Sequence, residues 1–165
     1  MPSINYNIDT TIFQSSAESC WYAAYCMLFT WKGKPTSSIR ERIEKAGLDY
    51  KDFWTNGLPE EKYPYTRLVL GLAGFRRGYF STLADDLDYF GQTLKNYGPF
   101  WCALSVPSEH AVVVSGIDVD AGKVIITNPN SDGTGYAQIQ KMAASEFKRR
   151  LGSKDIASAA QMFNE

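Results

Sequence analysis

The sequence predicts an α+β fold, and three observations support the prediction. The first half of the chain carries apolar residues at helical spacing, the second half carries short β-branched and aromatic runs, and the change falls at Gly98-Pro99. Helices followed by an antiparallel sheet define α+β architecture. The chain has 165 residues, of which 44% are hydrophobic, and it shows no repeat or linker. We therefore expect one domain over residues 1–165.

The helical half begins after an irregular or extended lead-in at residues 1–18. The run from Cys20 to about Lys32 has no Gly or Pro and is apolar nearly all round, which predicts a helix buried on most sides that ends at Gly33. The preceding Ser-Ala-Glu-Ser stretch offers a capping side chain. Apolar residues at helical spacing predict further helices over 36–50, 66–75 and 82–96, with Gly57, Pro59 and Pro64 breaking the pattern between them.

The second half predicts a sheet of short strands bounded by turn residues. The apolar and β-branched runs cover residues 100–106, 111–117, 123–127 and 136–140. Residues 118–122 are typical of a hairpin loop, and a last helix is expected over about 143–151. The middle two strands should therefore pair antiparallel.

Composition excludes several classes of function. The formal net charge is -1 and no stretch gathers five like charges, which argues against a general nucleic-acid surface. No apolar run is long enough to span a membrane, and the first residues lack the pattern of a signal peptide. An exported protein would need another route, or the chain is one domain of a longer protein. Three cysteines without C-x-x-C spacing and one histidine predict no disulfide framework, no metal site and no cofactor.

Cys20 is the candidate nucleophile because it falls in the first turn of the predicted helix. Unpaired backbone N–H groups and the helix dipole favour a thiolate at that place and lower the pKa of a thiol. Cys26 lies in the middle of the same helix and Cys102 in an apolar strand, where cysteine usually serves as a small hydrophobic residue. On this pattern alone, a structural role for Cys20 is equally compatible with the sequence.

His110, the only histidine, is the candidate base. It stands at the start of an apolar strand, and imidazole is the side chain that titrates near neutral pH. The hairpin brings Asn128 within a residue or two of direct opposition to His110, so the amide oxygen can accept from the ring and orient it. Asp118 and Asp120 lie at the far end of the hairpin, about 20 Å away at ~3.3 Å per residue. Asn128 and the residues after it are also typical of a turn.

An acyl-transfer site also needs donors for the negative charge that develops on the substrate oxygen, and a single donor contributes about 3–4 kcal/mol. The backbone N–H of Cys20 at a helix start is one candidate donor. The side-chain amide of Gln14, six residues upstream, is the candidate second donor.

Taken together, these segments resemble the papain superfamily of cysteine proteases. Gln-Ser-Ser-Ala-Glu-Ser-Cys-Trp resembles its oxyanion Gln and catalytic Cys, Glu-His-Ala-Val its His strand, and Thr-Asn-Pro-Asn-Ser-Asp-Gly its strand with the orienting Asn. The resemblance spans about residues 12–140. It implies a papain-like fold, with Cys20 at the start of the central helix and His110 and Asn128 on the sheet. It also implies Gln14 as the oxyanion donor.

Three departures place the chain among the smaller relatives. Cys20 is preceded by Ala-Glu-Ser instead of Cys-Gly-Ser, and 90 residues separate it from His110 where papain and the cathepsins have about 130–150. No Trp follows Asn128. The sequence is more similar to compact bacterial members, namely effector proteases and bacteriocin-leader peptidases, and Cys-Trp-Tyr-Ala-Ala and Tyr-Gly-Pro-Phe-Trp resemble the effector group. That resemblance implies a secreted effector or toxin with a polypeptide substrate, a specialised delivery route and a cognate inhibitor or immunity protein.

The sequence therefore predicts a cysteine endopeptidase that uses Cys20, His110, Asn128 and Gln14. Two other functions are compatible with it. The same residues suit a deamidase, a transglutaminase or a peptidoglycan amidase, because these enzymes share Cys-His chemistry. A catalytically silent binding module is the alternative from a different class, and the presence of all four expected side chains argues against it.

Overall fold

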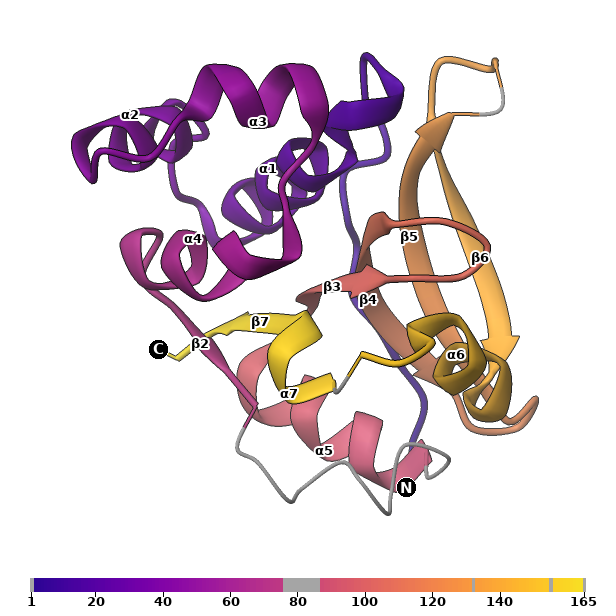
Figure 1. Ribbon diagram of the computed structural model, residues 1–165. Coiled ribbons are helices and arrows are strands. Elements are labelled where there is room, and N and C mark those ends of the chain that lie inside the picture. Colours follow the sequence, from indigo (N-terminus) through magenta and orange to yellow (C-terminus); the bar gives the residue numbers. More distant parts are fainter. Residues whose placement is uncertain (1, 76–86, 132, 155, 165) are drawn as a thin grey trace.

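The computed structural model describes residues 2–75, 87–131, 133–154 and 156–164, and it confirms the α+β class (Figure 1). The described helices of the first half are α1 (Cys20–Lys32), α2 (Ser37–Lys45), α3 (Tyr50–Asn56) and α4 (Tyr63–Val69), with short 3-10 helices η1 (Ala17–Ser19) and η2 (Glu60–Lys62). The later helices are α5 (Leu87–Tyr97), α6 (Ala144–Leu151) and α7 (Ile156–Ala159).

The strands form one antiparallel sheet. In chain order they are β1 (Ile4–Asn5), β2 (Leu72–Gly74), β3 (Phe100–Leu104), β4 (His110–Asp118), β5 (Lys123–Ser131), β6 (Ala137–Ala143) and β7 (Ala160–Phe163). Their order across the sheet is β2-β7-β3-β4-β5-β6, and β1 pairs with the far end of β4, beyond the stretch that pairs with β3. The central hairpin of β4 and β5 has the pairing that the sequence predicted.

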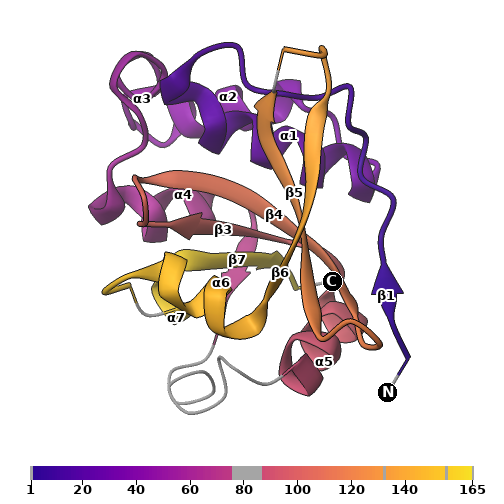
Figure 2. The ribbon, with the colours of Figure 1, turned by 90° about the vertical axis from the view of Figure 1, so that its right-hand side faces the viewer.

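The sheet lies between two groups of helices (Figure 2). Along β3, Trp101 and Ala103 belong to a core shared with α1, whereas Phe100, Cys102 and Leu104 belong to a core shared with α5, α6 and α7. This alternation is the two-residue period of a strand. Because both faces are covered at the centre of the sheet, β3 and β4 are apolar almost throughout.

Helix α1 is buried on nearly all sides, as its composition predicts. It passes against β4 and carries Tyr25, whose ring stacks on Trp101 with centroids 5.0 Å apart. The helix ends at Gly33, which adopts a positive φ of 78° and donates its N–H to the last carbonyls of the helix. Glycine accepts this left-handed conformation without steric cost.

Several predicted boundaries are wrong, and local chemistry explains each. The helix expected over 36–50 ends at Lys45, because Gly47 turns the chain at a φ of 79°. A separate helix, α3, begins at Tyr50, where Asp49 caps it by accepting from the N–H of Asp52. The helix expected over 66–75 starts earlier, since Pro64 occupies its first turn, where no N–H is needed. The end of that stretch is β2.

Other parts of the prediction have mixed outcomes. The strand expected over 100–106 ends at Leu104, because the N–H groups of Ser105 and Val106 donate to the carbonyl of Arg150. Helix α5 lies within the expected 82–96 helix and extends to Tyr97, while residues 82–86 lie outside the described residues. Strands β1, β2 and β7 and helices α3 and α7 were not predicted. A single domain over 1–165 stays a prediction.

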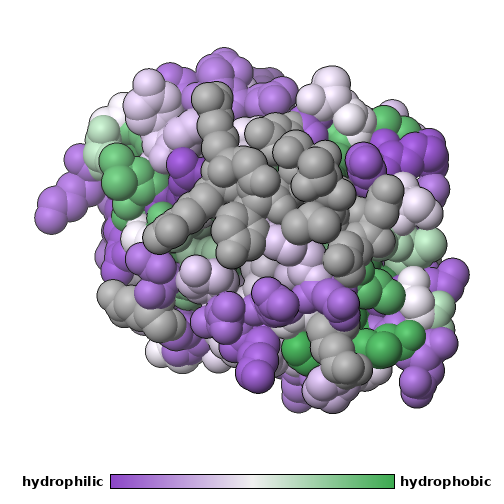
Figure 3. Space-filling view, turned by 90° about the horizontal axis from the view of Figure 1, so that it is seen from below, coloured by the Kyte–Doolittle hydropathy of each residue, from purple (hydrophilic) through white to green (hydrophobic). Residues whose placement is uncertain are grey.

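The surface seen from below is mostly hydrophilic where the structure describes it, with hydrophobic residues in separate patches (Figure 3). No helix within the described ranges is both long and apolar enough to cross a membrane.

Candidate active site

Cys20 is the first residue of α1 and lies in a cleft of about 480 Å³ between the helical half and the sheet. The preceding turn is fixed by two serines: the N–H of Ser16 donates to the Ser19 hydroxyl at 3.0 Å, and this hydroxyl donates to the Ser16 carbonyl at 3.1 Å. The turn η1 runs directly into α1, so Cys20 is placed at the N-terminal end of the helix. His110, Glu109 and Tyr63 line the same cleft.

The Cys20 thiol is held by backbone N–H groups but is largely buried. Its sulfur accepts from the N–H of Ala111 at 3.4 Å. Burial raises the pKa of Cys20 above its ordinary value, the N–H groups of Ala111, Trp21 and Cys20 itself lower it, and the Glu109 carboxylate raises it. The net direction is upward. The N–H groups thus act in the direction that the sequence predicted for a helix start, but burial outweighs them.

His110 is the first residue of β4, and its ring is fixed by Asn128. The distance between Nε2 and Oδ1 is 2.6 Å. Because an amide oxygen only accepts, Nε2 carries the ring hydrogen and Nδ1 is left as the basic nitrogen. Burial lowers the pKa of His110, and the hydrogen bond to Asn128 raises it.

Asn128 is itself fixed in orientation. Its Oδ1 also accepts from the N–H of Asn130 at 2.9 Å, and its Nδ2 donates to Gln140 Oε1 at 3.1 Å. These partners identify the oxygen and the nitrogen of the amide. Thr127 pairs with Val113, so Asn128 lies diagonally across the hairpin from His110, as the loop length predicted.

Gln14 does not line the cleft that contains Cys20. It lines a second hollow, which meets the first at Ala17, Glu109 and His110. Its Nε2 donates to the Ser16 carbonyl at 3.0 Å, and its Oε1 is buried without a partner among the described residues. The structure thus brings Cys20, His110 and Asn128 to one place and sets Gln14 at the edge of that place.

The other two cysteines are buried away from the cleft. Burial raises the pKa of Cys26 to about 11 and that of Cys102 to about 12. Both therefore remain thiols at neutral pH and serve as core residues, as their positions in the sequence indicated. Among the described residues, no group of His, Cys, Asp and Glu could hold a metal ion.

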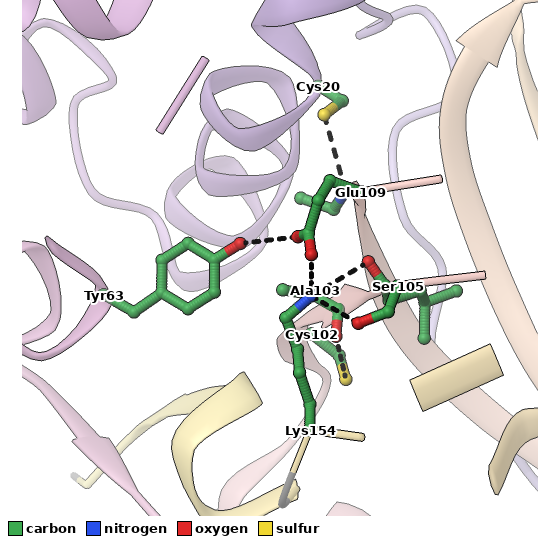
Figure 4. A network of polar contacts seen from close by, with 9 residues as sticks. Cys20, Tyr63, Cys102, Ala103, Ser105, Glu109 and Lys154 are labelled. Carbon is green, nitrogen blue, oxygen red and sulfur yellow. Dashed lines mark hydrogen bonds and ion pairs between the residues drawn. The ribbon is translucent and has the colours of Figure 1, made fainter. Parts of the chain in front are cut away.

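The sequence interpretation assigned no role in the site to three polar residues at the cleft. Glu109 lines both hollows, and its carboxylate accepts from Tyr63 at 3.2 Å and from Lys154 at 2.5 Å (Figure 4). Glu109 could have been noticed because it directly precedes His110. Tyr63 and Lys154 are distant in the sequence, and no local pattern signals their approach.

Comparison with known proteins identifies a family that matches this chain. Residues 2–152 match the model of a protein family that is described as papain-like cysteine protease AvrRpt2. The match covers most of the chain and includes all four candidate residues, while α7 and β7 lie beyond it. No curated protein matches the chain.

Proposed function

The chain belongs to the papain-like cysteine protease family of AvrRpt2, hydrolases that act on peptide bonds, and from this premise we propose that Cys20, His110 and Asn128 are its catalytic triad. One observation carries the proposal. A single cleft contains the thiol at the start of α1 and an imidazole whose Nε2 is held by an amide oxygen at 2.6 Å. The substrate is a polypeptide.

The triad acts through a proton transfer from the thiol to the ring. Burial disfavours a charge on Cys20 alone and a charge on His110 alone. When the proton moves from the thiol to the ring, the thiolate and the imidazolium form together, and their attraction offsets this cost. The thiolate then attacks the scissile carbonyl carbon, and Nδ1 of His110 gives its proton to the leaving amine. The product is a thioester between Cys20 and the acyl part of the substrate.

Hydrolysis of the thioester completes the cycle. His110 accepts a proton from water as the water attacks the thioester carbonyl, and the thiolate of Cys20 leaves. Throughout, Asn128 accepts from Nε2 and keeps the ring in the tautomer whose Nδ1 is basic. The reaction needs no cofactor.

Two donors are proposed for the substrate oxygen in the tetrahedral intermediate. The backbone N–H of Cys20 is the first, because it lies at the N-terminal end of α1 in the same residue as the attacking thiol. Gln14 is the second. Its Nε2 carries two hydrogens, of which the Ser16 carbonyl takes one, so the other is available when a substrate occupies the cleft.

The role of Cys20 is tested with Cys20→Ala. We expect this variant to keep the fold and to lose cleavage, measured as new N-termini across a proteome exposed to the wild type or to the variant. Cys26→Ala is the matched control, because Cys26 is buried in the same helix but does not line the cleft. Cleavage by Cys20→Ala would rule out the proposal. A mass gain of about one dalton in the substrate without new N-termini would indicate deamidation.

We also propose an effector or toxin role in a target cell, after delivery by a specialised bacterial secretion system. The support is the resemblance of the Cys20 segment and of residues 97–101 to effector proteases. A cognate inhibitor protein that covers the cleft belongs to this proposal. Expression of the wild type and of Cys20→Ala in the same host cells tests it, since only the wild type should impair the host.

A further inference from the structure

Lys154 places a buried ammonium group behind the cleft. Its side chain is only 2% exposed, and it lies in the segment between α6 and α7. The ammonium donates to Glu109 Oε1 at 2.5 Å, to Ser105 Oγ at 2.6 Å and to the Leu104 carbonyl at 3.4 Å (Figure 4). All three hydrogens of the ammonium thus have acceptors. A buried cation without such partners would be strongly destabilising.

These contacts fix the loop that leads to His110. Leu104 is the end of β3, Ser105 follows it, and Glu109 directly precedes His110. The N–H groups of Ser105 and Val106 also donate to the Arg150 carbonyl, at 2.7 and 3.0 Å. Both ends of the loop are therefore tied to the segment that follows β6, and Lys154 is the residue that contacts both.

Glu109 connects Lys154 to the proposed nucleophile. Figure 4 shows its side chain between Cys20 above and Lys154 below, with the Tyr63 hydroxyl on its second oxygen. Burial is the main cause of the raised pKa of Cys20, and the negative charge of Glu109, which lines the same cleft, adds to it. The Glu109 side chain is 60% exposed, so water screens part of that charge, and the ammonium of Lys154 opposes the rest.

The cleft around Cys20 is otherwise acidic. Besides Glu109, it is lined by the carboxyl-bearing side chains of Glu18 from η1, Asp52 from α3 and Glu60 from η2. His110 and Tyr63 are the other titratable groups that line it, and no Lys or Arg does so among the described residues. Lys154 does not line the cleft, but it contacts one of these four carboxylates, that of Glu109, and so brings a positive charge next to the group.

We propose that Lys154 and Glu109 form a charge-balanced pair that sets how readily Cys20 becomes a thiolate and positions the loop before His110. Lys154 is a positioning residue, since it acts through Glu109 and does not line the cleft. The match to the family model ends at residue 152, so this pair joins a residue inside the match to one beyond it. A role of this pair in catalysis rests on the proposed function of Cys20. Its effect on the Cys20 thiol can be measured whether or not Cys20 is the nucleophile.

The test measures the thiol directly, as the rate of alkylation of Cys20 by iodoacetamide across a pH series. This reagent is neutral and small, so cleft charge does not attract it and substrate binding does not enter. Mass spectrometry of the Cys20 peptide separates it from Cys26 and Cys102. Lys154→Met leaves the charge of Glu109 unopposed, and we expect alkylation near neutral pH to be about three- to tenfold slower. Glu109→Gln should make it faster by a similar factor.

The double variant distinguishes charge balance from packing. Lys154→Met with Glu109→Gln removes both charges, and we expect its alkylation rate to return to within about twofold of the wild type. Lys141→Met is the matched control, because Lys141 pairs with Asp118 at the opposite end of β4 and should leave the rate unchanged. Slower alkylation in both single variants, or no recovery in the double variant, would overturn the proposal.

Folding and peptide cleavage are measured for the same variants as the alkylation rate. If Lys154→Met does not fold, Glu109→Gln alone decides: faster alkylation than in the wild type supports the pair, and an equal or slower rate overturns it. Cleavage of a peptide substrate is measured for the same variants. Alkylation that follows the expected order in proteins that never cleave peptides would support the pair and count against the proposed function of Cys20.

Discussion

At the scale of single residues, the amide of Asn128 determines which nitrogen of His110 is basic. Its oxygen takes the Nε2 hydrogen and the Asn130 N–H, while its nitrogen is bound by Gln140. Asn128 and Asn130 lie on β5 and Gln140 lies on β6, so the amide that orients the ring is itself fixed by two strands of the sheet. The helix supplies the thiol.

Asn128→Ala removes the hydrogen bond that raises the pKa of His110. The pKa of the ring therefore falls, and the imidazolium that protonates the leaving amine is lost at a lower pH. We expect kcat/KM to fall by about 10- to 100-fold, with the alkaline limb of its pH profile moved to lower pH.

The control for this prediction is Asn130→Ala, because Asn130 contributes its backbone N–H to Asn128 and its carbonyl to Gln138, and alanine keeps both groups. Its pH profile should match that of the wild type. An alkaline limb that stays in place in Asn128→Ala would contradict the assigned role of the amide.

At the scale of elements, Tyr25 joins α1 to the last strand. Its hydroxyl, fully buried, donates to Gln161 Oε1 of β7 at 2.7 Å and lies 3.2 Å from the Thr66 hydroxyl of α4. Burial raises the pKa of Tyr25, so this hydroxyl stays protonated and remains a donor at all ordinary pH values. One helix residue therefore links three elements that are far apart in the sequence.

Tyr25→Phe leaves Gln161 Oε1 buried without this donor, and we expect it to lower the free energy of unfolding by about 1–3 kcal/mol. Tyr136→Phe is the control, since Tyr136 is 55% exposed and its loss should change stability by less than about 0.5 kcal/mol. Urea unfolding of both variants measures the difference. Equal midpoints for the two variants would contradict the prediction.

The elements that the sequence predicted well are those whose local pattern matches their environment. Helix α1 and the hairpin of β4 and β5 are long and largely apolar. Gly33 ends α1 in the left-handed conformation, which is a local signal and does not depend on tertiary contacts. Cys20 and Asn128 follow from them, because a helix start and a hairpin register are local rules. By contrast, Ala-Gln-Met-Phe in β7 has no strand pattern, and its pairing with β2 and β3 decides its structure.

The same distinction holds for the site. Glu109 and Lys154 are 45 residues apart, and their contact depends on how α6 returns the chain to the end of β3. Tyr63 reaches Glu109 from the other side of the cleft through the packing of α4. Neither approach has a signature in the sequence near His110, so charge balance around the thiol could only be seen once the sheet was in place.

At the scale of the whole molecule, β7 is an interior strand that joins β2 to the rest of the sheet. It lies between β2 and β3, and its residues Ala160–Phe163 are all buried. Phe163 packs against Phe29 of α1 and Met162 against the opposite core. The last strand therefore contributes to both cores, and its neighbours would have unpaired edges without it.

A chain that ends at Ala159 should lose its cooperative thermal transition and its near-ultraviolet circular dichroism, because the loss of β7 exposes apolar surface on both faces of the sheet. A chain that ends at Phe163 keeps β7 whole and serves as the control. A cooperative transition at the wild-type temperature in the shorter chain would show that β7 is dispensable.

The position of β7 also orders events during synthesis. A ribosome makes Cys20, His110 and Asn128 long before it makes Lys154 and the strand that separates β2 from β3. Until residues 160–163 have emerged, the nascent chain can form hairpins and helices but not the complete sheet, and contacts this distant in sequence form slowly. The protease therefore cannot assemble its full sheet until residues 160–163 have left the ribosome.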